Sequence, residues 1–169
     1  MNKKIYRLTI TSMITAIYFV CCIIEQGFAI GPIQCRISEA FTLLPLFFPQ
    51  AIIGVTLGCF IFNLTTGIVY DYVFGTLCTL SACIITYLIG KLIKNEKLKI
   101  ILGGIAPVLI NAIFIPLILI YGYKVEDGYP FLFFTILGGQ IISVYIIGSL
   151  LYFPLKKVFI KFNLIEKKA

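Results

Sequence analysis

The sequence is short of charged residues and contains no histidine and no tryptophan. Charged side chains make up 12% of its 169 residues, whereas soluble domains typically carry about 25%. Hydrophobic residues make up 60% of the chain. So few charges cannot cover a surface that faces water, but lipid accepts an apolar surface. The composition therefore predicts an integral membrane protein with several spans, located in the cell membrane.

Several motifs that carry chemistry are also absent. With no histidine and no C-x-x-C pair among the six cysteines, the sequence does not predict a zinc site. The cysteines lie mostly inside apolar runs and are interpreted as small hydrophobic residues. The chain has no G-x-x-x-x-G-K-[ST], H-E-x-x-H or G-x-S-x-G segment. We therefore expect no enzyme activity, no cofactor and no binding of ATP through a P-loop.

The sequence contains long apolar runs. Five runs contain no Asp, Glu, Lys or Arg: residues 8–24, 41–70, 72–90, 100–123 and 128–155. A membrane-spanning helix needs about 20 mainly apolar residues. Four of the runs have the length of one span, but the run at 41–70 is too long for one and too rich in proline to be a single straight helix.

The basic residues indicate how many spans there are. Twelve of the 14 lie in three clusters: Lys3, Lys4 and Arg7; Lys91, Lys94, Lys97 and Lys99; and Lys156, Lys157, Lys161, Lys167 and Lys168. Basic residues gather on the cytoplasmic side of membrane proteins, so an even number of crossings must separate the clusters. This topology and the attraction of lysine to anionic lipid account for the net charge of +7, which therefore does not indicate a nucleic-acid partner.

Splitting the long run between Pro45 and Gln50 satisfies this rule. The fold class predicted is an all-α membrane protein of six transmembrane helices, with both termini in the cytoplasm. The chain forms a single domain, 1–169, and its helices lie at about 8–24, 37–48, 50–70, 72–90, 100–121 and 130–153.

The second of these helices is short, with about 12 residues and a reach of about 18 Å. The segment 25–38 before it must then enter the membrane from outside as an ordered loop. Irregular backbone at that depth is tolerated only where it is buried in protein or lines a cavity. Glu25 and Gln26, at the start of this segment, are expected to form a solvated helix end.

Polar residues inside the spans are candidates for a functional or structural role, because a charged group at the centre of a span costs about 2.5–3.5 kcal/mol. With the helix directions assigned, several of them fall at compatible depths and predict a polar pocket that opens outward. The predicted substrate-binding residues are Arg36, Glu39, Asn63, Asp71, Asn111 and Gln140.

Each of these residues also has an alternative interpretation. Arg36 and Glu39 are three positions apart and can pair on one helix face. Asp71 can act as an N-cap in the outer loop. Asn111 and Gln140 can hold helices together through interhelical hydrogen bonds.

Small residues recur at a spacing of four, which lets another helix approach closely. Ser12 and Ala16 have this spacing in the first helix, and Gly54 and Gly58 have it in the third. Packing inside the bundle is the general interpretation of such pairs. For the first helix, docking of a partner subunit is the competing interpretation.

Three segments resemble one family. Residues 31–45 (GPIQCRISEAFTLLP), 54–63 (GVTLGCFIFN) and 71–77 (DYVFGTL) are similar to the first-loop, helix-three and helix-four segments of the queuosine-precursor transporter family, QueT. The resemblance in length and topology covers nearly the whole chain, and its specific part lies in the first 90 residues.

The resemblance implies a substrate-binding S component of an energy-coupling factor (ECF) importer, an ABC-type transporter. Its partners would be a transmembrane coupling protein and two ATPase subunits, and its substrate a deazaguanine precursor of queuosine. Ser12 and Ala16 are similar to the family's docking motif for the coupling protein, with serine in place of alanine at the first position. A carboxylate, Glu39 or Asp71, would accept hydrogen bonds from a guanine-like edge, and the other would pair with an aminomethyl cation.

Two alternatives stay open at this point. One is an S component for another vitamin-like nutrient, which would change the pocket and leave the fold and partners unchanged. The other is a membrane scaffold without transport function, whose polar residues only hold helices together.

Overall fold

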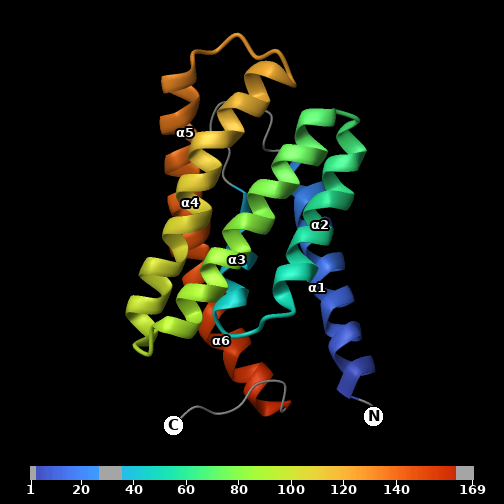
Figure 1. Ribbon diagram of the computed structural model, residues 1–169, viewed down its shortest axis with the longest axis vertical. Helices are drawn as coiled ribbons and strands as arrows, with labels where there is room; N and C mark the ends of the chain where they lie inside the picture. The colour runs from blue at the N-terminus through green and yellow to red at the C-terminus, as the bar shows by residue number, and fades with distance from the viewer. Residues whose placement is uncertain (1–2, 27–35, 163–169) are drawn as a thin grey trace.

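The computed structural model describes residues 3–26 and 36–162, and all the regular secondary structure in these ranges is helical. The elements in chain order are α1 (Lys3–Gln26), the 3-10 helix η1 (Ile37–Leu46), α2 (Ala51–Thr66), the π-helical turn η2 (Asp71–Gly75), α3 (Thr76–Leu92), α4 (Glu96–Tyr121), α5 (Tyr129–Ile141), the π-helical turn η3 (Ile142–Ile147) and α6 (Gly148–Lys161). Figure 1 shows them as one upright bundle.

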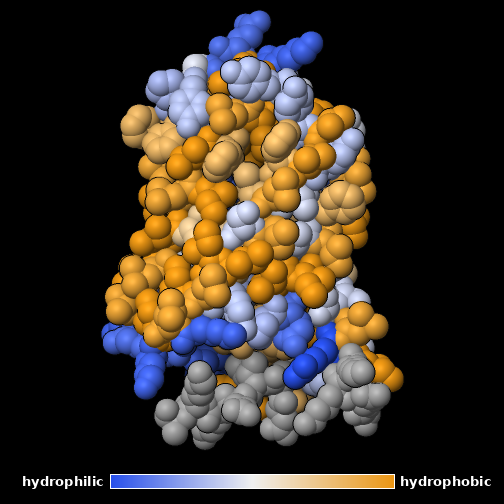
Figure 2. Space-filling view, viewed as in Figure 1, coloured by the Kyte–Doolittle hydropathy of each residue, from blue (hydrophilic) through white to orange (hydrophobic). Residues whose placement is uncertain are grey.

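Four helical stretches are long and apolar enough to cross a membrane: Ile5–Gln26, Asp71–Leu92, Glu96–Tyr121 and Tyr129–Lys161. Two shorter apolar helices, Ile37–Leu46 and Ala51–Thr66, accompany them. On the face shown in Figure 2, a broad hydrophobic band covers the middle of the bundle and hydrophilic side chains lie at both ends. The chain is therefore an all-helical, multi-pass membrane protein.

The two ends of the bundle hold different parts of the chain. The start of α1, the end of α6 and the connections at 47–50 and 93–95 lie at one end, which we call the terminal end (Figure 1). The connections at 67–70 and 122–128 lie at the opposite end, which we call the far end.

The second helix differs from its prediction in form. It is a 3-10 helix that ends at Leu46, with Pro45 inside it, where the sequence predicted a helix over 37–48. It contacts α1, α2, α3, α4, η3 and α6, so it is the central element of the bundle. Of the predicted outer loop at 25–38, only the two ends belong to the described residues.

The break after α2 also has a local cause. Gly67 adopts the left-handed conformation (φ 69°) that caps the helix at Thr66, before the predicted end at residue 70. The chain resumes a helical course directly afterwards, and the amide of Asp71 donates to the carbonyl of Ile68.

The pair Gly54 and Gly58 packs α2 against α1. A Cβ placed on Gly58 would lie 2.9 Å from the carbonyl oxygen of Thr15 and from the Tyr18 ring, and one on Gly54 would lie 2.9 Å from Ile14. Only glycine allows this approach, so the spacing serves packing inside the bundle. The contact fixes Tyr18, which is 2% exposed, beside the central helix.

Candidate functional site

Glu39 lies at the centre of the bundle and is 3% exposed. Its two carboxylate oxygens each accept a hydrogen bond from a different helix. Tyr18 Oη of α1 donates to Oε1 over 3.2 Å, and Asn111 Nδ2 of α4 donates to Oε2 over 3.1 Å. We call Glu39, Tyr18 and Asn111 the Glu39 cluster. Both of these donors are neutral, so neither of them cancels a charge on Glu39.

Asp71 forms a second cluster nearer the far end and is 6% exposed. Tyr123 Oη, from the connection between α4 and α5, donates to Asp71 Oδ2 over 2.7 Å. Asn63 Nδ2 donates to the backbone carbonyl of Asp71 over 3.1 Å. Asp71, Asn63 and Tyr123 are the Asp71 cluster. The predicted convergence of Asn63 and Asp71 is therefore a direct contact, made through the backbone of Asp71.

Two residues connect the clusters. Asn63 Nδ2 also lies 3.4 Å from Cys59 Sγ, and Cys59 belongs to the same buried cluster as Tyr18. The Arg36 guanidinium, at the start of η1, is attracted by the carboxylates of both Glu39 and Asp71. The predicted residues Arg36, Glu39, Asn63, Asp71 and Asn111 thus belong to one connected region.

Gln140 is 2% exposed on α5, and its Oε1 has no hydrogen-bond partner among the described residues. Leaving a buried acceptor unpaired costs about 1–3 kcal/mol. The Oε1 atom therefore does not hold helices together, whereas Asn111 does bridge α4 and η1 through Glu39.

The N-cap interpretation of Asp71 is wrong. Tyr70 precedes the helical turn, makes no side-chain cap, and Asp71 is the first residue inside the turn. The Asp71 carboxylate accepts from Tyr123 instead of capping its own helix.

The expectation of a solvated helix end is wrong for Glu25. Glu25 is 7% exposed, while the neighbouring Gln26 is exposed as expected. Glu25 accepts two hydrogen bonds from Ser38, one from the amide to Oε1 (2.7 Å) and one from Oγ to Oε2 (2.9 Å). The end of α1 is in this way tied to the first turn of η1, beside Glu39.

Ser12 and Ala16 lie on the outside of α1, exposed as a docking motif requires. They line a groove of about 370 Å³ between α1 and α2, and its walls are Leu8, Thr11, Thr15, Phe19, Ile53, Leu57 and Ile61. The groove is mainly apolar, and several of the α1 side chains that line it are small.

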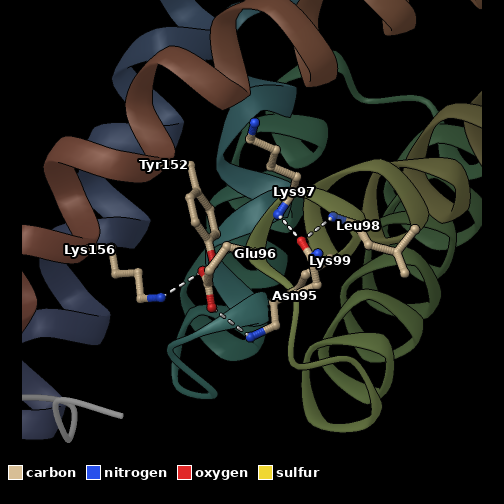
Figure 3. A network of polar contacts seen from close by, with 7 residues as sticks. All are labelled: Asn95, Glu96, Lys97, Leu98, Lys99, Tyr152 and Lys156. Carbon is tan, nitrogen blue, oxygen red and sulfur yellow. Dashed lines mark hydrogen bonds and ion pairs between the residues drawn. The ribbon is translucent and has the colours of Figure 1, made fainter. Parts of the chain in front are cut away.

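A third carboxylate, Glu96, lies at the terminal end in a different setting (Figure 3). Lys156 Nζ of α6 lies 2.6 Å from Oε2, Lys99 Nζ lies 3.1 Å from Oε1, and Tyr152 Oη donates to Oε2 over 2.7 Å. Asn95 is the N-cap of α4, and its Oδ1 accepts hydrogen bonds from the amides of Lys97 and Leu98. We call Glu96, Lys99, Tyr152 and Lys156 the Glu96 cluster, which joins α4 to α6.

Sequence analysis did not identify Tyr18, Tyr123 or Glu25 as part of this region. Tyr18 stands in an apolar run and Tyr123 in a connection, so neither has a local signal. One signal was available for Tyr18. It follows Thr11 and Ile14 at helical spacing and therefore lies on the buried stripe of α1.

The chain was compared with known protein families, curated proteins and solved structures. The family model described as QueT transporter matches residues 8–157, which is most of the chain. No curated protein and no solved structure matches the chain.

Proposed function

Because this chain belongs to the QueT transporter family, we propose that it is the substrate-binding S component of an ECF importer and that it takes up a deazaguanine precursor of queuosine. The observation that carries the proposal is the buried acid-rich region around Glu39 and Asp71. Three carboxylates, including Glu25, are buried there, and Arg36 is the basic residue beside them. A region of this composition suits a small ligand that brings hydrogen-bond donors and a positive charge.

The proposed topology has six crossings with both termini in the cytoplasm. The four long apolar stretches and the two shorter helices supply the six segments. The lysines of the terminal end support the orientation, since Lys91, Lys94, Lys97 and Lys157 are all exposed there. The far end, with Asp71 and Tyr123, then faces outward.

The substrate is held by the two carboxylates. A guanine-like edge carries an amino group and a ring N–H side by side, and a carboxylate accepts such a pair of donors on its two oxygens. A second carboxylate pairs with an aminomethyl cation. Glu39 and Asp71 are the two acids, and Arg36, Asn63, Asn111 and Gln140 contact the other edges of the ligand. The unpartnered Oε1 of Gln140 supports this role, because a ligand N–H would satisfy it.

The groove that contains Ser12 and Ala16 is the proposed docking surface for the transmembrane coupling protein. Small side chains let a partner helix approach the backbone of α1 closely. The chain contains no P-loop, so the energy for transport comes from the two ATPase subunits bound to the coupling protein.

Equilibrium binding by the purified protein in detergent tests the proposal. The ligands are deazaguanine precursors, with guanine, riboflavin, thiamine and biotin as controls. We expect saturable binding of a deazaguanine that is lost in Glu39→Gln and in Asp71→Asn. Glu126→Gln and Asp127→Asn are matched controls, because both of these acids are exposed in the connection at 122–128.

Binding of a control vitamin alone would refute the substrate and favour an S component for another nutrient. A folded protein that binds none of these ligands would favour the membrane scaffold. Loss of binding in Glu126→Gln, matching the loss in Glu39→Gln, would contradict the location of the site.

A further inference from the structure

Tyr123 has a position that the proposed function does not by itself explain. It is 40% exposed in the connection between α4 and α5, yet its hydroxyl reaches inward to the buried Asp71, 52 residues earlier in the chain. Burial and the hydrogen bond to Asp71 raise the pKa of Tyr123 to about 12. The hydroxyl therefore keeps its proton at physiological pH and acts as a neutral donor to Oδ2.

The backbone of the connection is arranged to hold Tyr123 in place. The amide of Tyr123 donates to the carbonyl of Leu119, and the amide of Val125 donates to the same carbonyl. Lys124, between them, has a positive φ of 55°, a conformation that costs a residue other than glycine about 1–3 kcal/mol. Backbone hydrogen bonds on both sides of the strained residue therefore hold the backbone of Tyr123 in place.

The same connection is packed directly against the chain that leads to Asp71. A Cβ on Gly122 would lie 3.0 Å from Ile68 Cγ2 and 3.1 Å from Tyr70 Cβ, so Gly122 touches the residues just before Asp71. The packing of Gly122 against the side chains of Ile68 and Tyr70 thus keeps the connection that carries Tyr123 close to Asp71.

The other oxygen of Asp71 is positioned by a glycine. A Cβ on Gly75 would lie 2.9 Å from Asp71 Oδ1 and 3.0 Å from Asn63 Nδ2. Because glycine has no Cβ, Oδ1 and the Asn63 amide can lie close to the helix backbone at this point. Tyr123 holds Oδ2 and Gly75 makes room for Oδ1, so the carboxylate has one orientation.

The two carboxylates therefore differ in how their hydrogen-bond donors are distributed over the two oxygens. Tyr18 and Asn111 each donate to a different oxygen of Glu39, and each oxygen has a second lone pair, which is the pattern that a two-donor edge needs. On Asp71, the Tyr123 hydroxyl donates to Oδ2 and withdraws negative charge from that oxygen, so this hydrogen bond makes Oδ1 the stronger acceptor of the two for a cation. A compact ammonium group is a point charge that needs only one carboxylate oxygen, whereas a guanine-like edge needs two.

Resting on the proposed function, we propose that Tyr123 is a specificity-determining residue: it orients Asp71 so that Oδ1 pairs with the ligand's aminomethyl cation, while Glu39 binds the two-donor ring edge. Tyr123 acts through Asp71 and is a positioning residue. This assigns the two acids to the two ends of the ligand.

The test compares two ligands, an aminomethyl deazaguanine and the same ring without the amine. Dissociation constants are measured for the full chain and for Tyr123→Phe, which removes only the hydroxyl. We expect Tyr123→Phe to weaken binding of the aminated ligand about tenfold, because a hydrogen bond to a charged group is lost. Binding of the ligand without the amine should change less than about twofold.

Two controls separate positioning from folding. Tyr121→Phe changes a tyrosine that is 66% exposed two residues away, and it should affect neither ligand. Gly75→Ala should weaken binding of the aminated ligand more than binding of the ligand without the amine, since the added methyl displaces Oδ1 as well as the Asn63 amide. Its matched control is Gly138→Ala, where a Cβ meets no described atom within 4 Å.

Equal losses for both ligands in Tyr123→Phe and Gly75→Ala would overturn the inference, because a merely structural role weakens both alike. Unchanged binding of the aminated ligand in Tyr123→Phe would overturn it as well. If the unmodified chain binds neither deazaguanine, the proposed function fails and this inference fails with it.

Discussion

The Glu39 and Glu96 clusters both surround a carboxylate on helices of the same bundle, but with different partners. Glu96 meets two lysines and a tyrosine at the terminal end, and its side chain is 36% exposed. Glu39 is 3% exposed and accepts from a tyrosine and an asparagine.

This difference separates two uses of a buried or half-buried acid. An acid that is paired with lysines joins two helices. Its negative charge is already compensated, so it has little charge left to attract a ligand. Glu39 instead shares the Arg36 guanidinium with Asp71, and a ligand that brings a positive charge would add a second cation for these two carboxylates, which are costly to bury in an apolar interior. The contrast supports a structural role for Glu96 and the proposed binding role of Glu39.

The largest effect is expected for Glu39→Gln. The substitution keeps the size of the side chain and removes its charge, so binding of a deazaguanine should weaken by about 10- to 100-fold. Unfolding should change little, because a glutamine can still accept from Tyr18. Calorimetric titration measures the first effect and thermal unfolding in detergent the second. A large loss of thermal stability with unchanged affinity would reverse the roles of the two clusters.

Two asparagines, Asn111 on α4 and Asn95 at its N-cap, sharpen the comparison. Asn111→Leu removes the donor to Glu39 Oε2 and should weaken ligand binding about tenfold. Asn95→Ala removes the helix cap beside Glu96 and should cost about 1 kcal/mol of stability without changing the affinity. Affinity and unfolding midpoint are measured for both variants. A loss of affinity in Asn95→Ala as large as that in Asn111→Leu would contradict the distinction.

Glu96→Gln tests the structural role of the terminal end. The variant loses its charge toward Lys99 and Lys156, and we expect a loss of about 1 kcal/mol, because the partly exposed site is screened by solvent. The midpoint of thermal unfolding measures this loss, and the ligand dissociation constant should stay within about twofold. Lys157→Gln, at an exposed lysine of the same helix α6 as Lys156, is the control and should leave stability unchanged.

Salt is expected to give the smallest effect. The Debye length falls from about 10 Å at 0.1 M to about 3 Å at 1 M salt, and partly exposed pairs are screened more than buried ones. High salt should therefore lower the unfolding midpoint of the unmodified chain slightly and that of Glu96→Gln less. An equal salt dependence in both proteins would show that the Glu96 pairs do not contribute to stability.

Sequence reasoning predicted the helices better than the contacts between them. The range 100–121 lies within α4 and the range 8–24 within α1, because long apolar runs leave a spanning chain few alternatives to helix. The 3-10 form of η1 was not predictable from the sequence, because 3-10 helices of this length are uncommon. It is the contacts of η1 with the surrounding helices, which no local pattern reports, that favour this form.

For the candidate site, the polar residues were identified by their cost in an apolar run, but their partners were not. Glu39 and Asn111 are 72 residues apart, and no local pattern reports a hydrogen bond over that separation. Tyr18, Tyr123 and Glu25 were missed for the same reason. A tyrosine in a span looks like any other aromatic residue, and a glutamate at a helix end looks solvated until the packing of η1 is known.

The most direct test of the account is the shift of the unfolding midpoint on adding an aminomethyl deazaguanine, measured in parallel for the unmodified chain, Asp71→Asn and Glu96→Gln. A ligand at 100 times its dissociation constant stabilises the folded state by about 2.7 kcal/mol, so one scan reports both folding and binding. We expect Glu96→Gln to unfold at a lower temperature but to keep the full ligand-induced shift, whereas folded Asp71→Asn should lose most of this shift. An undiminished shift in Asp71→Asn, or its loss in Glu96→Gln, would contradict the assignment of binding to the Glu39 and Asp71 clusters.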